Sequence, residues 1–169
     1  MALKIDVLGV EWKYPDVYVV SREQIKQFAH AVKSAHPASI DDDAAAELGH
    51  DRLVAPLTFL SILAVMLQRH FFQHNDVGME TMQIVQVDQK FKYHRPVYEG
   101  DRVFASIVVD SVEERFGADI VTTRNVLKND AGEVVMESFT TLMGHEGDNS
   151  ISAKWDPETG QVVRTATSD

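Results

Sequence analysis

The segment from residue 34 to residue 43 holds the side chains with the clearest potential for acid–base chemistry. His36 is followed closely by Asp41, Asp42 and Asp43. An imidazole beside a carboxylate can act as a general acid–base pair, provided that the groups come within hydrogen-bond reach, about 3 Å. The alternative is structural, because aspartates at the start of a short helix are favoured by its positive end. We favour the structural interpretation and expect His36 to lie in a loop.

Other kinds of catalytic or metal chemistry have weaker support. The chain has no cysteine, which excludes a disulfide scaffold, a thiolate metal ligand and a thiol nucleophile. His70 and His74 are four residues apart, a spacing that suits two metal ligands on one helix. No third ligand is evident, and histidines are also favoured at the end of a helix by its dipole. We therefore expect neither a metal nor a cofactor.

The charge balance limits the classes of binding partner. The chain of 169 residues has 16 basic and 26 acidic residues, a formal net charge of −10. This balance argues against nucleic acids and anionic membranes, both of which reward lysine and arginine. The longest apolar run, residues 57–67, is too short to span a bilayer. No signal peptide is evident at the N-terminus, and we expect a cytoplasmic protein without membrane insertion.

Helices are predicted in the first half of the chain. Ser21 and Gln24 form a capping box, and an apolar stripe at helical spacing follows it: Ile25, Phe28, Ala29 and Val32. A short helix is expected over 42–48, ending at Gly49. Pro56 is expected to open a long helix that continues to about Gln73. Because this helix is apolar almost all the way round, we expect it to be buried on most sides.

Strands dominate the second half of the chain. A short strand is expected at 17–20, and four further strands are predicted where the period changes to two: 85–93, 102–112, 120–128 and 134–143. Short turns between the four predict an antiparallel meander. With one apolar helix before them, they predict an α+β hotdog fold, a curved antiparallel sheet wrapped around a long buried helix. We expect a single domain over 1–144 and a polar C-terminal extension over 145–169.

Several of these segments resemble the MaoC-like hydratase family. The start of the long helix and the turn after the first meander strand carry the general resemblance: 54–59 and 95–101. A narrower similarity to C-type subunits of mycobacterial (3R)-hydroxyacyl-ACP dehydratases lies in four further segments: 80–89, 116–125, 140–144 and 154–156. The resemblance implies the hotdog fold, a catalytic B-type partner subunit, and action on long-chain acyl thioesters in fatty-acid and mycolic-acid elongation.

The family's acid–base pair is missing from its expected place. In the family, an Asp and a His lie in a D-x-N-P-x-H segment after the first helix. With Pro37 as the anchor, Ser34 stands at the Asp position and Ser39 at the His position. A serine is not a base near neutral pH unless another base activates it. We therefore expect no catalytic residue in this chain, and expect the Asp and His to come from the partner subunit.

Binding is the role that remains, and two groups of residues are candidates for it. The wall of an acyl channel is assigned to residues on or near the long helix: Phe59, Ser61, Ile62 and Val65. Contact with an acidic acyl carrier protein is assigned to the densest positive cluster: Lys90, Lys92, His94 and Arg95. Ordinary core packing explains the first group equally well, and a solvated strand face explains the second.

Two other functions stay open at this point. One is a self-sufficient homodimeric enoyl-thioester hydratase that uses His36 and Asp41, and Ser34 and Ser39 argue against it. The other is a hotdog scaffold that binds acyl carriers without chemistry, and the breadth of the resemblance argues against it. In each case the edge strands of a curved sheet need a partner, so we expect an oligomer.

Overall fold

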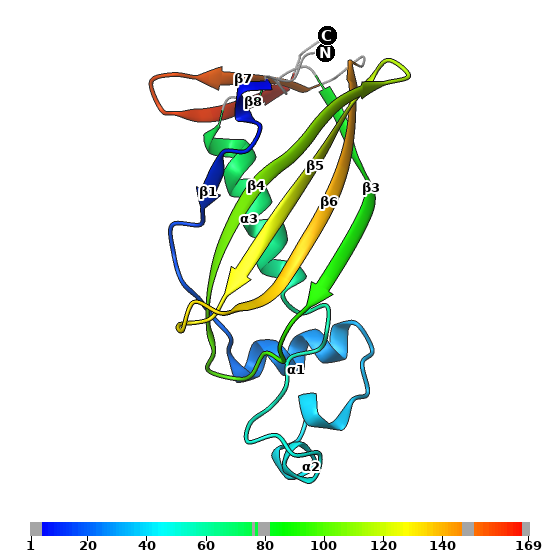
Figure 1. Ribbon diagram of the computed structural model, residues 1–169, viewed down its shortest axis with the longest axis vertical. Helices are drawn as coiled ribbons and strands as arrows, with labels where there is room; N and C mark the ends of the chain where they lie inside the picture. Colours follow the sequence, from blue (N-terminus) through cyan, green and yellow to red (C-terminus); the bar gives the residue numbers. More distant parts are fainter. Residues whose placement is uncertain (1–4, 76, 78–81, 147–150, 167–169) are drawn as a thin grey trace.

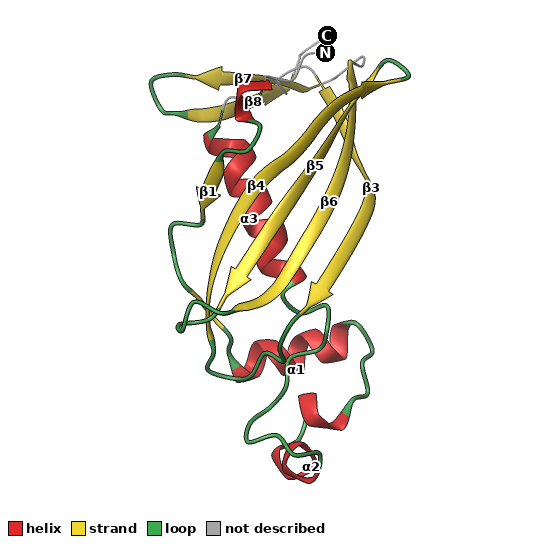
Figure 2. Cartoon of the chain, in the orientation of Figure 1, coloured by secondary structure: helices red, strands yellow, loops and turns green. Residues whose placement is uncertain are grey.

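A computed structural model gives the fold of the chain for residues 5–75, 77, 82–146 and 151–166. Figure 1 shows the arrangement of the elements along the chain, and Figure 2 shows a long curved sheet with α1 and α2 at one end. The α1 and α2 helices lie beyond this end, and a C-terminal hairpin lies at the opposite end. Helix α3 runs along the sheet between them.

The first half of the chain forms short elements, among them the helix predicted after the capping box at Ser21. In order they are η1 (Ile5–Val7), β1 (Glu11–Lys13), β2 (Tyr18–Val19), α1 (Arg22–Ala31), η2 (Pro37–Ser39), α2 (Asp42–Glu47) and α3 (Ser61–His74). The Ser21 side chain accepts a hydrogen bond from the Gln24 backbone N–H at 3.2 Å, which confirms the predicted cap of α1. Asp41 caps α2 by accepting from the Ala44 N–H at 2.9 Å.

The second half forms the predicted antiparallel meander. Its strands are β3 (Met82–Tyr93), β4 (Arg102–Arg115), β5 (Ala118–Lys128) and β6 (Val134–Glu146). Within the described residues the sheet has the order β1-β4-β5-β6-β3, and β2 also pairs with β4. All of these pairings are antiparallel.

The core lies between α3 and one face of the sheet. Leu63, Leu67 and Phe71 are buried on the helix side, and alternate residues of β4 and β5 are buried on the sheet side. A curved antiparallel sheet that packs on one long helix is the predicted α+β hotdog fold, which is thereby confirmed.

The long helix differs from its prediction in two ways. It begins at Ser61 rather than at Pro56, because residues 57–60 form turns in which the Phe59 N–H donates to the Pro56 carbonyl at 2.8 Å. It is also not buried on most sides, since Val65 is 62% exposed and Met66 is 40% exposed. A single chain therefore leaves one apolar side of α3 uncovered.

Strand β3 is also more exposed than the alternating pattern predicted. It is an edge strand that pairs only with β6 among the described residues, and its register shifts between Gln86 and Asp88. Val85 and Val87 are each more than half exposed. The apolar residues of β3 therefore do not all face the core of this chain.

The C-terminal part beyond the predicted boundary is folded where the structure describes it. Strand β6 continues past residue 144 to Glu146, and β7 (Ile151–Asp156) pairs with β8 (Gln161–Ala166) in an antiparallel hairpin. Strand β8 contacts α3, and Trp155 is half-buried. Among the described helices, none is long and apolar enough to cross a membrane.

Candidate functional site

A cavity of about 710 Å³ lies where three loop segments meet the sheet. Its lining comes from residues 32–39, 50–60 and 93–97 and from the start of β6. Backbone hydrogen bonds join these segments: the Val54 N–H donates to the Ala38 carbonyl, and the Ala55 N–H donates to the Val97 carbonyl. Most of the lining is apolar, with a few polar side chains among it, as in many small-molecule sites.

Both serines at the expected catalytic positions line this cavity. Ser34 lies in the turn that follows α1, directly after Lys33, whose φ is 54°. In this turn the Ser34 N–H donates a hydrogen bond to the Ala29 carbonyl at 2.8 Å. Ser39 is 2% exposed, and its hydroxyl donates to the Val54 carbonyl at 2.7 Å. The Ser39 hydroxyl is thus hydrogen-bonded to the backbone, and no base contacts it among the described interactions.

His36 lines the same cavity but does not form the alternative catalytic pair. Asp41 uses its side chain to cap α2, and no hydrogen bond or ion pair joins it to His36 in the part of the chain that the structure describes. The lining contains neither Asp nor Glu among the described residues. This geometry supplies no carboxylate that could orient His36 or remove a proton.

His50 is a cavity residue that sequence reasoning missed. It is half-buried, and its Nδ1 lies 3.2 Å from the hydroxyl of Tyr98. In the sequence it is isolated from every other candidate, and the fold brings it next to residue 98 through the pairing of Val54 with Tyr98. The one available signal was its position directly after Gly49, the residue that ends α2.

The four predicted channel residues do not line the cavity. Phe59 is fully buried in the core, Ser61 and Ile62 are half-buried, and Val65 is exposed on α3. Their neighbours Leu57, Thr58 and Leu60 line the cavity instead. The assignment of Phe59, Ser61, Ile62 and Val65 to an acyl channel stays a prediction.

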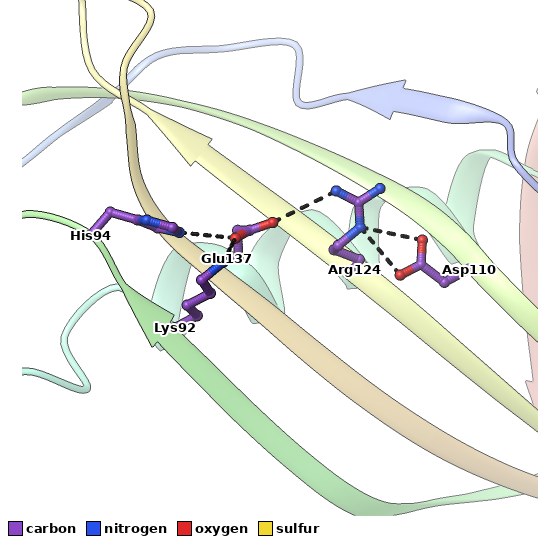
Figure 3. A network of polar contacts seen from close by, with 5 residues as sticks. All are labelled: Lys92, His94, Asp110, Arg124 and Glu137. Atoms are coloured by element: carbon purple, nitrogen blue, oxygen red, sulfur yellow. Dashed lines mark hydrogen bonds and ion pairs between the residues drawn. The ribbon is translucent and has the colours of Figure 1, made fainter.

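The predicted carrier-binding cluster lies along the end of β3, next to the cavity. Figure 3 shows Lys92 and His94 both pointing toward Glu137, with distances of 3.5 and 2.9 Å to Oε2 of that carboxylate. The hydrogen bond from His94, followed by the neighbouring Lys92, lowers the pKa of Glu137. Arg95 pairs with Glu133. His94 and Arg95 also line the cavity, so the cluster reaches its edge.

Lys90, the remaining residue of this cluster, lies on the edge strand β3, and the polar network crosses the sheet from β6 through β5 to β4. The Lys90 ammonium lies 6.0 Å from the ring centre of Phe139. Beyond Glu137, the network continues through Arg124, whose Nη1 lies 3.7 Å from Oε1, to Asp110 (Figure 3). Lys92, Arg95 and Arg124 therefore each have a carboxylate within ion-pair distance, and no ion pair of Lys90 is present among the described residues.

The histidine pair on α3 lies at the other end of the helix. The Trp12 indole N–H donates to Nδ1 of His70 at 3.2 Å, and the rings of His70 and His74 stack at 4.0 Å. Burial lowers the pKa of His70, and the charge of His74 lowers it further. No group of three metal-ligating side chains occurs among the described residues.

Comparison with known proteins decides the family. The model of the FAS1-like dehydratase domain region matches residues 6–138. The chain belongs to the FAS1-like dehydratase family. A UPF0336 protein of Mycobacterium tuberculosis is 61% identical over 166 residues, which cover 98% of this chain and 100% of the relative.

Solved structures of the family share its hotdog fold. A C-terminally truncated HadBC (3R-hydroxyacyl-ACP dehydratase) complex from Mycobacterium tuberculosis contains a chain with 57% identity and a TM-score of 0.78, covering 84% of this chain and 100% of that chain. A MaoC-like dehydratase is 34% identical with a TM-score of 0.76, covering 83% of this chain and 43% of that chain. The predicted resemblance to MaoC-like hotdog proteins is confirmed.

Proposed function

We propose that this chain is the non-catalytic, substrate-binding subunit of a heterodimeric (3R)-hydroxyacyl-ACP dehydratase. Its partner is a B-type hotdog subunit that supplies the catalytic Asp and His. The substrates are long-chain acyl thioesters of fatty-acid and mycolic-acid elongation, presented by an acyl carrier protein.

One observation carries the proposal. In the cavity where the family holds its acid–base pair, this chain has Ser34 and Ser39 and no carboxylate among the described lining residues. Dehydration needs a base for the α-proton and an acid for the departing hydroxyl, and each group contributes about 10²–10⁴-fold. Without either group, this chain alone has little means of turnover.

The exposed apolar surface supports a partner subunit. Val65 and Met66 on α3 and Val85 and Val87 on β3 are exposed in the single chain. An unpaired edge strand invites pairing with another sheet. The 57% identical structure is a chain of a complex, HadBC, which is consistent with a hotdog subunit as the partner.

The positive cluster supports an acidic carrier. His94 and Arg95 lie at the edge of the cavity, and Lys90 and Lys92 continue the cluster on β3. Against the overall charge of −10, this is a local basic surface next to the candidate binding site. Glu137 and Glu133 hold Lys92 and Arg95 in place, and opposite charges favour encounter with an acidic protein.

The test is hydration of a trans-2-enoyl thioester by this chain alone and by its mixture with a B-type subunit. We expect no measurable turnover alone and robust turnover in the mixture. His30→Ala, on the exposed surface of α1, is the matched control for His36→Ala and should behave as the wild type in the mixture. Robust turnover by the chain alone, removed by His36→Ala, would overturn the proposal in favour of a self-sufficient hydratase.

A further inference from the structure

His50 is a polar residue of the cavity wall, and its neighbours hold it in place. Helix α2 ends in a turn in which Gly49 has φ of 85°, the Gly49 N–H donates to the Ala46 carbonyl, and the His50 N–H donates to the Ala45 carbonyl. These two bonds form a Schellman motif, which fixes the direction in which the chain leaves the helix. The backbone of His50 is therefore fixed beside the cavity that its side chain lines.

The side chain of His50 is fixed as well. Its Nδ1 lies 3.2 Å from the Tyr98 hydroxyl, and the two rings pack with their centres 5.7 Å apart. Tyr98 is held in turn by the guanidinium of Arg52, 5.3 Å from its ring centre. Arg52 donates to the Glu99 carbonyl at 2.6 Å and to Asp101 at 3.2 Å. Such a supporting shell fixes the orientation of a histidine ring, and the Tyr98 hydroxyl can pair with either tautomer of His50.

This arrangement leaves the second ring nitrogen of His50 for a ligand. Within the described residues, the Tyr98 hydroxyl is the one hydrogen-bond partner of the His50 ring. When Tyr98 donates to Nδ1, the Nε2–H of His50 is a donor. Three other polar side chains of the lining are already engaged: Ser39 bonds to the backbone, His94 to Glu137 and Arg95 to Glu133. Ser34, His36 and Thr58 also line the cavity. The cavity thus combines mostly apolar walls with a His50 ring whose orientation is fixed.

We infer that this cavity is a second, unreactive binding site for the amide-bearing arm of an acyl thioester, in which Nε2–H of His50 donates to an amide or thioester carbonyl. The inference rests on the proposed function for the identity of the ligand. A volume of about 710 Å³ lies within the range of small-molecule sites. Ser34 and Ser39 leave the bound thioester without an acid–base pair from this chain, so it is held and not converted.

The experiment measures how many equivalents of a pantetheine thioether bind to the complex of this chain with its B-type partner. S-octyl pantetheine, a thioether that cannot be hydrated, is titrated into the complex by calorimetry. We expect two equivalents per heterodimer for the wild type, and one for His50→Leu. His50→Gln, which keeps an amide donor, should restore the second equivalent, and Tyr98→Phe should weaken it by about three- to ten-fold because the orienting hydrogen bond is lost.

Controls separate this inference from the proposed function. His30→Leu makes the same substitution on the exposed surface of α1 and should keep two equivalents. Melting temperature and elution volume show that each variant is folded and assembled. One equivalent in a wild-type complex that hydrates enoyl thioesters would overturn the second site alone. Two equivalents in a wild-type complex without turnover would support the site and overturn the proposed function.

Discussion

Phe59 offers a direct test of whether the segment before α3 forms core or channel. The side chain is fully buried. Its ring packs edge-on against Phe28, with centres 5.5 Å apart, and lies 6.3 Å from the ring of Tyr18. These contacts join the segment before α3 to α1 and β2. Phe59→Ala would remove both aromatic contacts and leave a cavity in the core.

The expected cost follows from this burial. Replacing a buried phenylalanine by alanine costs about 3–5 kcal/mol of unfolding free energy. For a domain of this size each kcal/mol lowers the melting temperature by about 2–4 °C, so the expected decrease is roughly 6–20 °C. Differential scanning calorimetry of the purified chain measures it.

Leu57→Ala is the matched control two residues earlier. Leu57 is 71% exposed and lines the cavity. Its truncation should change the free energy of unfolding by less than about 0.5 kcal/mol. If Phe59→Ala melts within about 2 °C of the wild type, Phe59 is not a core residue and the reasoning from its burial is refuted. The channel assignment would then become the better account of it.

Three further changes test other parts of the structure. Gly49→Ala meets no atom within 4 Å of the new Cβ, so the strain of φ at 85° alone should cost about 1–2 kcal/mol in urea unfolding, and an unchanged midpoint would contradict this. Glu137→Gln should cost about 1 kcal/mol at pH 7. Because its folded-state pKa is lowered, this difference should be present above the unfolded value and vanish as the pH falls through the folded one; a difference independent of pH would argue against it. His70 has a lowered pKa in the folded state, so the unfolded state binds more protons, and stability should decline as the pH falls below about 6.5. Proton NMR should show the His70 ring titrating below that value, and a midpoint above it would contradict the burial argument.

The sequence predicts the elements well where local chemistry determines them. The cap at Ser21, the end of α2 at Gly49 and the four meander strands depend on residues close together in the chain. The predicted start of α3 was wrong, because Pro56 fits the first turn of an α-helix and also the tighter turns that residues 57–60 form. Propensity alone does not distinguish the two.

The exposure of α3 and β3 was not predictable from periodicity. An apolar residue such as Val65 or Val85 has the same pattern whether its own chain or another covers it. The residues of the candidate site also differ in whether the sequence could reveal them. Ser34 and Ser39 were found from a local motif, while His50 needed the tertiary contact with Tyr98 that no spacing in the sequence reveals.

The central claim is that catalysis belongs to the partner, and paired histidine variants of the complex test it most directly. Hydration of a trans-2-enoyl thioester is compared for two complexes. One carries His36→Ala in this chain, and the other carries alanine at the catalytic histidine of the B-type subunit. We predict a loss of about 10²–10⁴-fold for the second complex, and turnover within about ten-fold of the wild type for the first. The reverse pattern, with activity following His36, would contradict the account.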